Sequence, residues 1–349
     1  MSEQPTVGEN RLPVSVLTGF LGSGKTTLLG KLIKHPDMHN TAVVINEFGE
    51  IGLDHFLVER ADENTILLDS GCLCCTIRGD LINTLRTLIR RRHKAEIPPF
   101  DRVVIETTGL ADPAPILHTL MTDPVVTATF RLDSVITTVD AVSGPGQLDE
   151  HQESVKQAAV ADRLLITKAD LADDIAGLES RLRTINPAAP IHPVDHGAIE
   201  PDRLFGAALY DPATKTADVE HWLAEEAYAA ESSHHHHEHG HDPNRHDDHI
   251  SAFCIAHDEP LDWEKFVDWI EALISVHGFH LLRIKGILNV VGANGPVAVH
   301  GVQHIFHPPA MLPDWPSEDR RSRLVLITRD LPQGPIEEMF RAFVETESA

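Results

Sequence analysis

The sequence predicts an α/β protein in which helices cover both faces of a mostly parallel sheet, followed by a small α+β domain. In the first half, short β-branched runs alternate with helical patterns, and this order needs crossover connections between parallel strands. The second half has runs of strands with two helices. Between the halves lies an acidic, histidine-dense stretch that cannot form a core. The predicted boundaries are therefore 1–206, 207–249 for the linker or loop, and 250–349.

The elements follow from strand-length apolar runs and from helical spacing. In the first domain we expect strands at 14–18, 41–46, 65–69, 102–106, 134–140, 163–168 and 189–194, with helices that include 27–34 and 77–92. In the second domain we expect strands at 250–257, 279–291, 301–307 and 322–328, the second of them bent at Gly286. Helices are expected at 261–275, whose apolar stripe is typical of core packing, and at 335–345.

Charge and composition exclude several classes of protein. The 349 residues include 29 basic and 53 acidic side chains, a formal charge of −24 that opposes binding to nucleic acid or to an anionic membrane. We interpret a basic run at 86–94 as cations at a helix end, where they interact favourably with the helix dipole and face solvent. The N-terminus lacks a signal-peptide pattern and no apolar run approaches the roughly 18 residues of a membrane span, so we expect a cytoplasmic protein.

A phosphate-binding loop is predicted between the first strand and the first helix. Residues 19–26, GFLGSGKT, fit G-x-x-x-x-G-K-[S/T] in the strand–loop–helix context that the motif requires. Backbone N–H groups of such a loop surround phosphate oxygens, the lysine adds a positive charge and the threonine hydroxyl can bind Mg²⁺. The predicted phosphate ligands are Gly19, Gly22, Ser23, Gly24, Lys25, Thr26 and Thr27.

A second phosphate-sensing element is predicted at the end of the strand 102–106. Glu106 can hold Mg²⁺ through water or orient the attacking water, and the Gly109 N–H can meet the γ-phosphate. Most such motifs have Asp where this chain has Glu106, so both roles stay open. The predicted catalytic residues are Lys25, Thr26, Glu106 and Gly109. The sequence shows no arginine finger, and slow turnover is expected.

The stretch TKAD at 167–170 predicts guanine as the base. It fits [N/T]-K-x-D after a strand, with Thr167 in place of the usual Asn. Asp170 can accept both guanine N1–H and N2–H₂, a pair that adenine does not offer, while Lys168 covers the ring. GTP is therefore favoured over ATP. The stretch VDHG at 194–197 is a further candidate for the guanine pocket.

Three of the four cysteines, Cys72, Cys74 and Cys75, form the stretch GCLCC before a predicted helix. A helix N-terminus favours thiolate, and thiolates at this spacing can converge on Zn²⁺. Zn²⁺ needs four ligands, and Glu47 or Glu50 in the switch-like segment INEFGEIG can supply another. Buried structural cysteines and a redox sensor are the alternatives. Cys254, alone on a strand, is expected to be buried.

A histidine tract at 234–249 offers weaker metal ligands of poor selectivity, including for Co²⁺ and Ni²⁺. We interpret it as a collector that raises the local metal concentration, and a solvated acidic linker is the alternative. Its members are His234, His235, His236, His237, His239, His241, His246 and His249.

The stretches GFLGSGKTTLL, INEFGE, GCLCC, ETTG and TKAD, in this order, resemble the CobW family of P-loop GTPases. KGIL at 285–288 and GVQ at 301–303 are similar to its YjiA-like subgroup. The resemblance covers nearly the whole chain. It implies a SIMIBI-type GTPase domain followed by a CobW C-terminal domain, slow GTP hydrolysis, and metal binding at the C-x-C-C motif, here Cys72, Cys74 and Cys75. It also implies a nucleotide-dependent homodimer.

The sequence therefore predicts a GTP-hydrolysing metal chaperone that binds GTP, Mg²⁺ and Zn²⁺, or Co²⁺ or Ni²⁺ in place of Zn²⁺, and delivers metal to a client metalloprotein. One alternative is a metal store or buffer in which GTP only regulates binding. A cobalt or nickel insertase, for cobalamin synthesis or nitrile hydratase activation, is another. A small-molecule kinase that uses the P-loop is the remote alternative.

Overall fold

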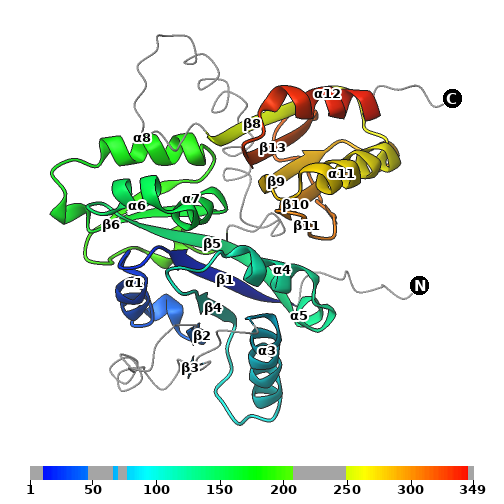
Figure 1. Cartoon of the computed structure of the whole chain (residues 1–349). Helices are drawn as coiled ribbons and strands as arrows, with labels where there is room; N and C mark the ends of the chain where they lie inside the picture. The colour runs from blue at the N-terminus through cyan, green and yellow to red at the C-terminus, as the bar shows by residue number, and fades with distance from the viewer. Residues whose placement is uncertain (1–10, 46–65, 70–76, 207–248, 345–349) are drawn as a thin grey trace.

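The computed structural model describes residues 11–45, 66–69, 77–206 and 249–344 (Figure 1). The first domain contains a seven-stranded sheet in the order β3-β2-β4-β1-β5-β6-β7 within this described part, and every strand pairing in it is parallel. Its strands are β1 (Leu12–Gly19), β2 (Thr41–Ile45), β3 (Ile66–Asp69), β4 (Arg102–Glu106), β5 (Phe130–Asp140), β6 (Arg163–Thr167) and β7 (Ile191–Val194). The prediction of a mostly parallel sheet is confirmed.

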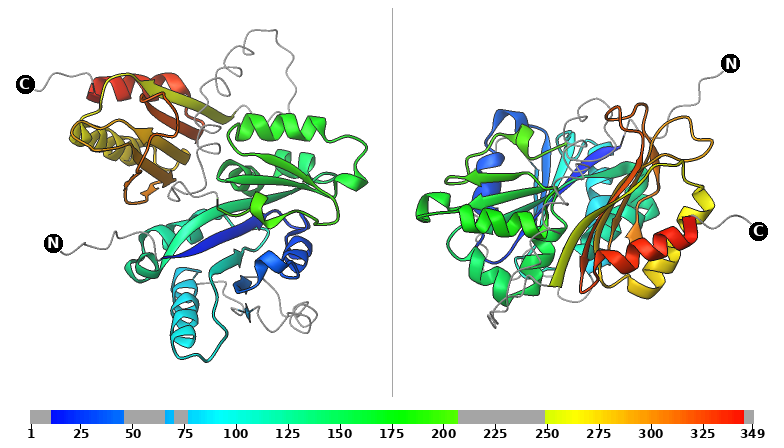
Figure 2. Two further views of the ribbon diagram at one scale, coloured as in Figure 1. Left: turned by 180° about the vertical axis from the view of Figure 1, so that it is seen from behind. Right: turned by 90° about the horizontal axis from the view of Figure 1, so that it is seen from above.

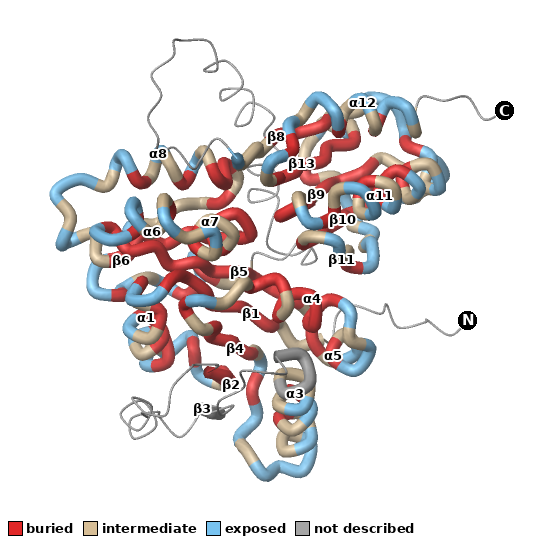
Figure 3. Tube along the Cα trace, viewed as in Figure 1, coloured by how far each residue is buried: buried red, intermediate tan, exposed pale blue. Residues whose placement is uncertain are grey.

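Helices pack on both faces of this sheet. On one face the leucines of α1 (Lys25–Leu32) contact β2, β4 and β6. On the other face lie α3 (Ile77–His93), α4 (Ala114–Thr122), α5 (Pro124–Thr129), α6 (Gly144–Glu150), α7 (Gln152–Ala159) and α8 (Ala176–Ile185). The strands β1, β2, β4, β5 and β6 are buried almost throughout, whereas the outer helix faces are exposed (Figure 3). This burial on both faces explains why the strands are continuous apolar runs.

The second domain contains an antiparallel sheet in the order β11-β10-β9-β13-β8, with β12 paired to β10. Its elements are β8 (Ile250–His257), α11 (Trp263–His277), β9 (Leu281–Leu288), β10 (Val297–Val302), β11 (Ile305–Phe306), β12 (Ala310–Met311), β13 (Ser322–Arg329) and α12 (Gln333–Val344). Asp262 caps α11 by accepting hydrogen bonds from Glu264 N and Lys265 N. The two helices pack on the sheet face that points away from the first domain (Figure 2).

Two sequence predictions for this domain need correction. The stretch 301–307 is not one strand but a tight hairpin between β10 and β11, in which Gln303 adopts a left-handed φ of 52°. The strand predicted at 279–291 is also shorter, Leu281–Leu288, and its pairing with β10 and β13 continues without a register shift through Gly286, where we predicted a bend. A Cβ at Gly286 would lie 2.5 Å from Leu324 Cδ2, so close packing requires the glycine there.

The two domains pack directly against each other. Leu282 and Ile327 of the second sheet join the hydrophobic cluster formed by α7 and α8, and Val302 joins the cluster around α4. The His118 ring nitrogen Nε2 lies 2.9 Å from the carbonyl oxygen of Val302. Arg329 of β13 donates to the Gln152 side chain at 2.9 Å. Side chains of the second sheet and of the helices of the first domain thus form a shared interface.

A buried charge cluster lies within this interface. Asp162, between α7 and β6, accepts hydrogen bonds from Val135 N, from Arg283 Nη2 at 2.6 Å and from Lys285 Nζ. Burial raises the pKa of Asp162, but the two cations outweigh it and hold the pKa well below the usual range. Burial, together with Arg283, lowers the pKa of Lys285 to about 8 although Asp162 opposes the shift. The domains are therefore joined by charge as well as by apolar contact.

Candidate nucleotide site

The predicted phosphate loop has the backbone conformation that its glycines allow. Gly19, Gly22 and Gly24 have φ values of 140°, 74° and 86°, which side-chain-bearing residues rarely adopt. A Cβ at Gly19 would lie 2.3 Å from Thr138 Oγ1, so no other residue fits there. Ser23 Oγ lies 2.7 Å from the same hydroxyl. The loop is thus bound to the end of the neighbouring strand β5 and held in one shape.

Lys25 is buried inside this loop at the first position of α1. Its Nζ donates to Gly19 O at 2.8 Å and to Phe20 O at 3.1 Å, so the loop curls around the ammonium group. Gly24 precedes α1 as a left-handed N-cap without a side-chain cap. The first N–H groups of a helix have no partner within the helix and bind anions readily. The loop therefore presents a cation and helix N–H groups at one place.

Oxygen atoms of Thr26 and Glu106 meet beside this loop. Glu106 ends β4, which pairs with β1 in a register that sets Glu106 opposite Leu17. The carboxylate is buried, with 4 % of the residue exposed, and accepts a hydrogen bond from Thr26 Oγ1 at 2.9 Å. A hydroxyl and a carboxylate are hard oxygen donors of the kind that Mg²⁺ prefers. The pair fits the predicted magnesium site.

The loop after β4 touches the phosphate loop at Gly109. A Cβ at Gly109 would lie 2.6 Å from Leu21 N, so only glycine permits this approach. Gln157 Nε2 donates to Gly109 O at 3.3 Å and to Ala111 O at 3.0 Å, which fixes the loop to α7. Asp112, three residues further, accepts hydrogen bonds from Lys156 Nζ at 2.9 Å and from Gln303 Nε2 of the second domain at 3.4 Å. The loop predicted to sense the γ-phosphate thus contacts both domains.

The TKAD stretch lies at the adjacent strand end, as predicted. Thr167 Oγ1 donates to Ser23 O at 2.7 Å, which joins the stretch predicted to bind the base to the predicted phosphate loop. Lys168 takes a left-handed φ of 57° and donates to Asp140 Oδ2 at 2.5 Å. Burial raises the pKa of Asp140, but the hydrogen bonds from Lys168 and from the Ser143 and Val142 N–H groups leave it lowered. Asp140 is therefore a charged anchor for Lys168.

Asp170 has a neighbour from the VDHG stretch. His196 Nδ1 lies 3.5 Å from Asp170 Oδ2, and both residues follow the ends of adjacent strands. Gly197, with a φ of 75°, packs against α1, where a Cβ would lie 3.3 Å from Leu28 Cα. The structure therefore brings VDHG next to TKAD and to the helix that follows the phosphate loop.

Three side chains that position this site were missed by sequence reasoning: Thr138, Asp140 and Gln157. Asp140 could have been predicted from the sequence, because it ends a predicted strand, as Glu106 and Thr167 do. Thr138 and Gln157 carried none, since their contacts are with residues 115 and 48 positions away.

The predicted metal ligands Glu47, Glu50, Cys72, Cys74 and Cys75 lie outside the described residues, as do His234 to His246. In the described ranges no group of three or more His, Cys, Asp or Glu side chains could hold a metal ion. β2 and β3 end at Ile45 and Asp69, which pair with each other, and Ile45 also pairs with Glu106. His249 is described and its Nδ1 bonds Asp330 of the second domain. Cys254 is buried on β8, as expected.

The fold and this site define a P-loop nucleotide-binding protein with an additional α+β domain. A family model described as CobW/HypB/UreG, nucleotide-binding domain, matches residues 13–193. A second, the cobalamin synthesis protein cobW C-terminal domain, matches residues 250–344. The chain belongs to this CobW family, as its motifs predicted.

Relatives match over most of their length. The chain is 33% identical to zinc chaperone YjiA of Escherichia coli over 334 residues, which cover 95% of this chain and 98% of the relative. It is 27% identical to zinc chaperone CobW of Sinorhizobium sp over 316 residues, which cover 81% and 83%. The crystal structure of Zn(II)-bound YjiA GTPase from E. coli covers 96% of this chain and 99% of its own, with 30% identity and a TM-score of 0.70.

No helix among the described residues is long and apolar enough to cross a membrane.

Proposed function

We propose that this protein is a GTP-hydrolysing zinc chaperone, in which GTP binding and hydrolysis control the loading and delivery of the metal. One observation carries the proposal: the strands β2 and β4, which pair Ile45 with Glu106, lead into the predicted switch glutamates and into the γ-phosphate-sensing loop. The segment predicted to sense the γ-phosphate and the segment predicted to hold metal thus follow neighbouring strand ends of the sheet. The names of the relatives, zinc chaperones and a zinc-bound GTPase, support zinc as the cargo.

The phosphate loop performs two tasks in this proposal. Gly19, Gly22, Ser23, Gly24, Lys25, Thr26 and Thr27 bind the triphosphate through N–H groups, hydroxyls and the Lys25 ammonium. These donors are fixed before GTP arrives, so they stabilise the charge that develops during transfer of the γ-phosphoryl group to water. Mg²⁺ supplies further charge neutralisation when bound, and Thr26 with Glu106 would hold it. Glu106 and the Gly109 N–H orient the water and the γ-phosphate.

Guanine is bound by Asp170, with Lys168 over the ring and Thr167 supporting the loop. Asp140 holds the ammonium of Lys168 in place through their 2.5 Å hydrogen bond. Because an adenine would leave the Asp170 acceptors unpaired, discrimination by this group is strong. The contact of His196 with Asp170 supports the assignment of VDHG to the same pocket.

The cargo binds to Cys72, Cys74 and Cys75, with Glu47 or Glu50 as a further ligand. An incomplete thiolate set suits a metal that has to leave for a client metalloprotein. The histidine tract collects metal at lower affinity, and the second domain recognises the client. We place this cycle in the cytoplasm.

A nucleotide-dependent homodimer is supported by the surface of the nucleotide edge. Four large apolar side chains that follow β1, β4, β5 and β6 are each more than half exposed there: Leu21, Leu110, Val142 and Leu171. Apolar side chains gathered around a ligand site are typical of an interaction surface. Light scattering should therefore give a larger mass with a non-hydrolysable GTP analogue than with GDP, and Leu110→Ser should weaken that shift.

The decisive experiment is a zinc titration against a competing chelator in the empty, GDP-bound and GTP-analogue-bound states. We expect the zinc dissociation constant to differ between GDP and the analogue, because the two ligands share the β2–β4 edge. Replacing Cys72, Cys74 and Cys75 by Ser should remove the tight site, whereas Cys254→Ala, the matched control on β8, should leave it intact. Zinc affinity that is identical in all three states would refute the coupling and would favour the alternative function, a metal store.

A further variant separates the two predicted tiers of metal binding. Deleting residues 233–249 should lower the total number of zinc ions bound and spare the tight site. Loss of the tight site in this variant would show that the tract, and not the thiolates, binds the cargo. Phosphate that appears on an acceptor molecule, in place of free phosphate, would identify a kinase.

A further inference from the structure

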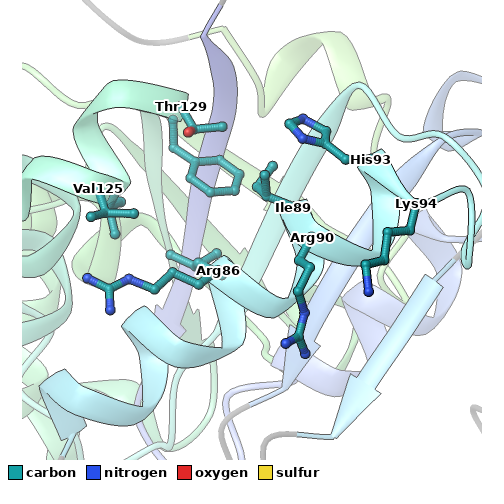
Figure 4. A pocket seen from close by; sticks show the side chains of 10 residues that line it. Arg86, Ile89, Arg90, His93, Lys94, Val125 and Thr129 are labelled. Carbon is teal, nitrogen blue, oxygen red and sulfur yellow. The ribbon is translucent and has the colours of Figure 1, made fainter.

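A pocket of about 390 Å³ lies between α3 and α5, away from the nucleotide loops (Figure 4). Its floor is apolar and is formed by Leu85 and Ile89 of α3 with Val126 and Phe130 from the other side. Val125, at the edge, is 46 % exposed although it is a large apolar residue. The volume falls at the lower end of the range of about 300–1,000 Å³ for ligand pockets. It can take one or two bulky apolar side chains.

The rim of the pocket is basic. Arg86 and Arg90 are four residues apart and so lie on one face of α3, about 6 Å apart along its axis, and Lys94 follows at the same interval just after the helix ends. His93 lines the same pocket. In Figure 4 the Arg86 side chain extends toward Val125, while Arg90 and Lys94 extend side by side from the following turns. An apolar floor thus adjoins a row of cations.

Helix stability alone does not explain this row. The helix dipole favours cations only in the last turn, and Arg86 lies seven residues before His93, where α3 ends. Like charges four residues apart destabilise a helix by about 0.2–0.5 kcal/mol for each pair. Lys94 has an exposed ion pair with Glu96 at 3.7 Å, but no carboxylate within the described ranges pairs with Arg86 or Arg90. The cations of this row are therefore available to pair with anionic groups of another molecule.

Charge complementarity identifies the kind of partner. The chain as a whole has a formal charge of −24, and this row has the opposite sign. A nucleic acid would satisfy the cations but would leave the apolar floor exposed. In an amphipathic helix, carboxylates at i, i+4 and i+8 are spaced about 6 Å apart, which matches the spacing of the row. The apolar stripe beside these carboxylates would reach the floor of the pocket.

We propose that the groove between α3 and α5 is a docking site for an acidic amphipathic helix of a partner protein. Carboxylates of that helix pair with Arg86, Arg90 and Lys94, and a leucine or phenylalanine enters the pocket over Ile89 and Phe130. α3 begins at Ile77, directly after the predicted thiolate segment, and Arg86 lies nine residues further, about 13 Å along the helix. A docked partner thus contacts the same helix that begins directly after the predicted metal segment. Its identity as the metal client rests on the proposed function, but the docking itself does not.

The test is fluorescence anisotropy with a labelled 18-residue helical peptide. It has Glu at three positions spaced by four and a Leu/Phe stripe beside them. We expect saturable binding to the full chain, weakened at least about 10-fold by Arg86→Glu with Arg90→Glu because two ion pairs become repulsive. The matched control is Lys31→Glu in the last turn of α1 with Lys34→Glu just after that helix, which makes the same change in net charge and should leave the affinity within about twofold.

A second peptide and a second variant address the apolar floor. A peptide with Ser in place of the Leu/Phe stripe should bind at least about 10-fold more weakly, and Val125→Glu should weaken the original peptide without lowering the melting temperature. Equal binding of the two peptides, or unchanged binding by the Arg86/Arg90 variant, would overturn the proposal. Tighter binding of duplex DNA or of phosphatidylserine vesicles than of the peptide at the same row would overturn it as well.

The GTPase rate and the zinc titration of the same variants separate this proposal from the proposed function. Both should stay at wild-type values, because the groove lies outside the nucleotide site. If the peptide binds but the zinc affinity does not depend on the bound nucleotide, the docking site is supported and the chaperone cycle is refuted.

Discussion

Two lysines with little exposure to solvent, the buried Lys25 and the partly buried Lys285, serve different purposes in the two domains. Lys25 lies in a glycine-rich loop at the start of α1, where its ammonium donates to the carbonyl oxygens of Gly19 and Phe20. Lys285 lies in the middle of β9, where its ammonium bonds the Asp162 carboxylate across the domain interface. The first stands beside uncapped helix N–H groups that also bind anions, and the second beside a fixed anion of the protein.

The difference lies in what surrounds each charge. At the nucleotide edge, a cation and N–H groups converge on space that a phosphate can fill, so burial prepares the site for a ligand. At the interface, the carboxylate is already part of the chain, and Arg283 completes the cluster. Buried charge therefore marks a binding site in one region and a structural junction in the other.

The largest expected effect is that of Lys25→Ala on GTP hydrolysis. Loss of one preorganised positive group at the γ-phosphate should reduce the rate by at least about 10²-fold, as for other fixed donors to a developing anion. Phosphate release measures the rate, and a thermal melt should show a folded protein. Lys31→Ala, on the exposed face of the same helix, is the control. Wild-type turnover by Lys25→Ala would contradict the assignment of the loop.

The next largest is the effect of Asp162→Asn on stability. Removing the carboxylate leaves the buried Arg283 and the partly buried Lys285 without their anion, and breaking a buried pair in this way lowers stability by about 3–5 kcal/mol. Urea unfolding measures the change in the free energy of unfolding. Asp149→Asn, which breaks the more exposed pair with Arg181, should change it by less than about 1 kcal/mol. Equal effects of the two variants would show that the interface cluster is no stronger than a surface pair.

A smaller effect concerns the pH dependence of stability. The pKa of Lys285 is about 8 in the folded protein, below its ordinary value of 10.5, because of burial and Arg283. Between these two values the unfolded chain binds more protons, so this group makes the free energy of unfolding rise with pH from about 8 to 10.5. Urea unfolding at pH 8, 9 and 10 should show that this rise is reduced in Lys285→Met. A wild-type slope in the variant would contradict the shift.

The smallest effect is that of Gln303→Asn, which tests the link between the two regions. Asn tolerates the left-handed backbone of Gln303 but is too short to reach Asp112, and loss of this 3.4 Å bond should change stability by less than about 1 kcal/mol. Hydrogen exchange of the β10–β11 hairpin should respond to a GTP analogue in the wild type and less in the variant. Gln333→Asn, on α12, is the control. An unchanged response would show that Asp112 does not transmit nucleotide state.

Local patterns in the sequence determined much of the first domain. The β-branched runs at 41–46, 102–106 and 163–168 became strands within one residue of the prediction, because a strand buried on both faces has to be apolar along its whole length. The phosphate loop and TKAD were found because their chemistry depends on residues within eight positions of each other. GVQHIFH was predicted as one strand and is a hairpin, since its composition hides the turn at Gln303 and His304.

By itself the sequence determined the class of the sheet, the position of the phosphate loop, the preference for guanine and the family. Only the tertiary structure decided which distant groups meet: Asp140 with Lys168, Asp162 with Arg283 and Lys285, and the basic row of α3 with the apolar floor beside α5. The reason is physical. Periodicity and motif spacing report forces between near neighbours, whereas contacts between residues 28 to 123 positions apart depend on how helices and sheets pack.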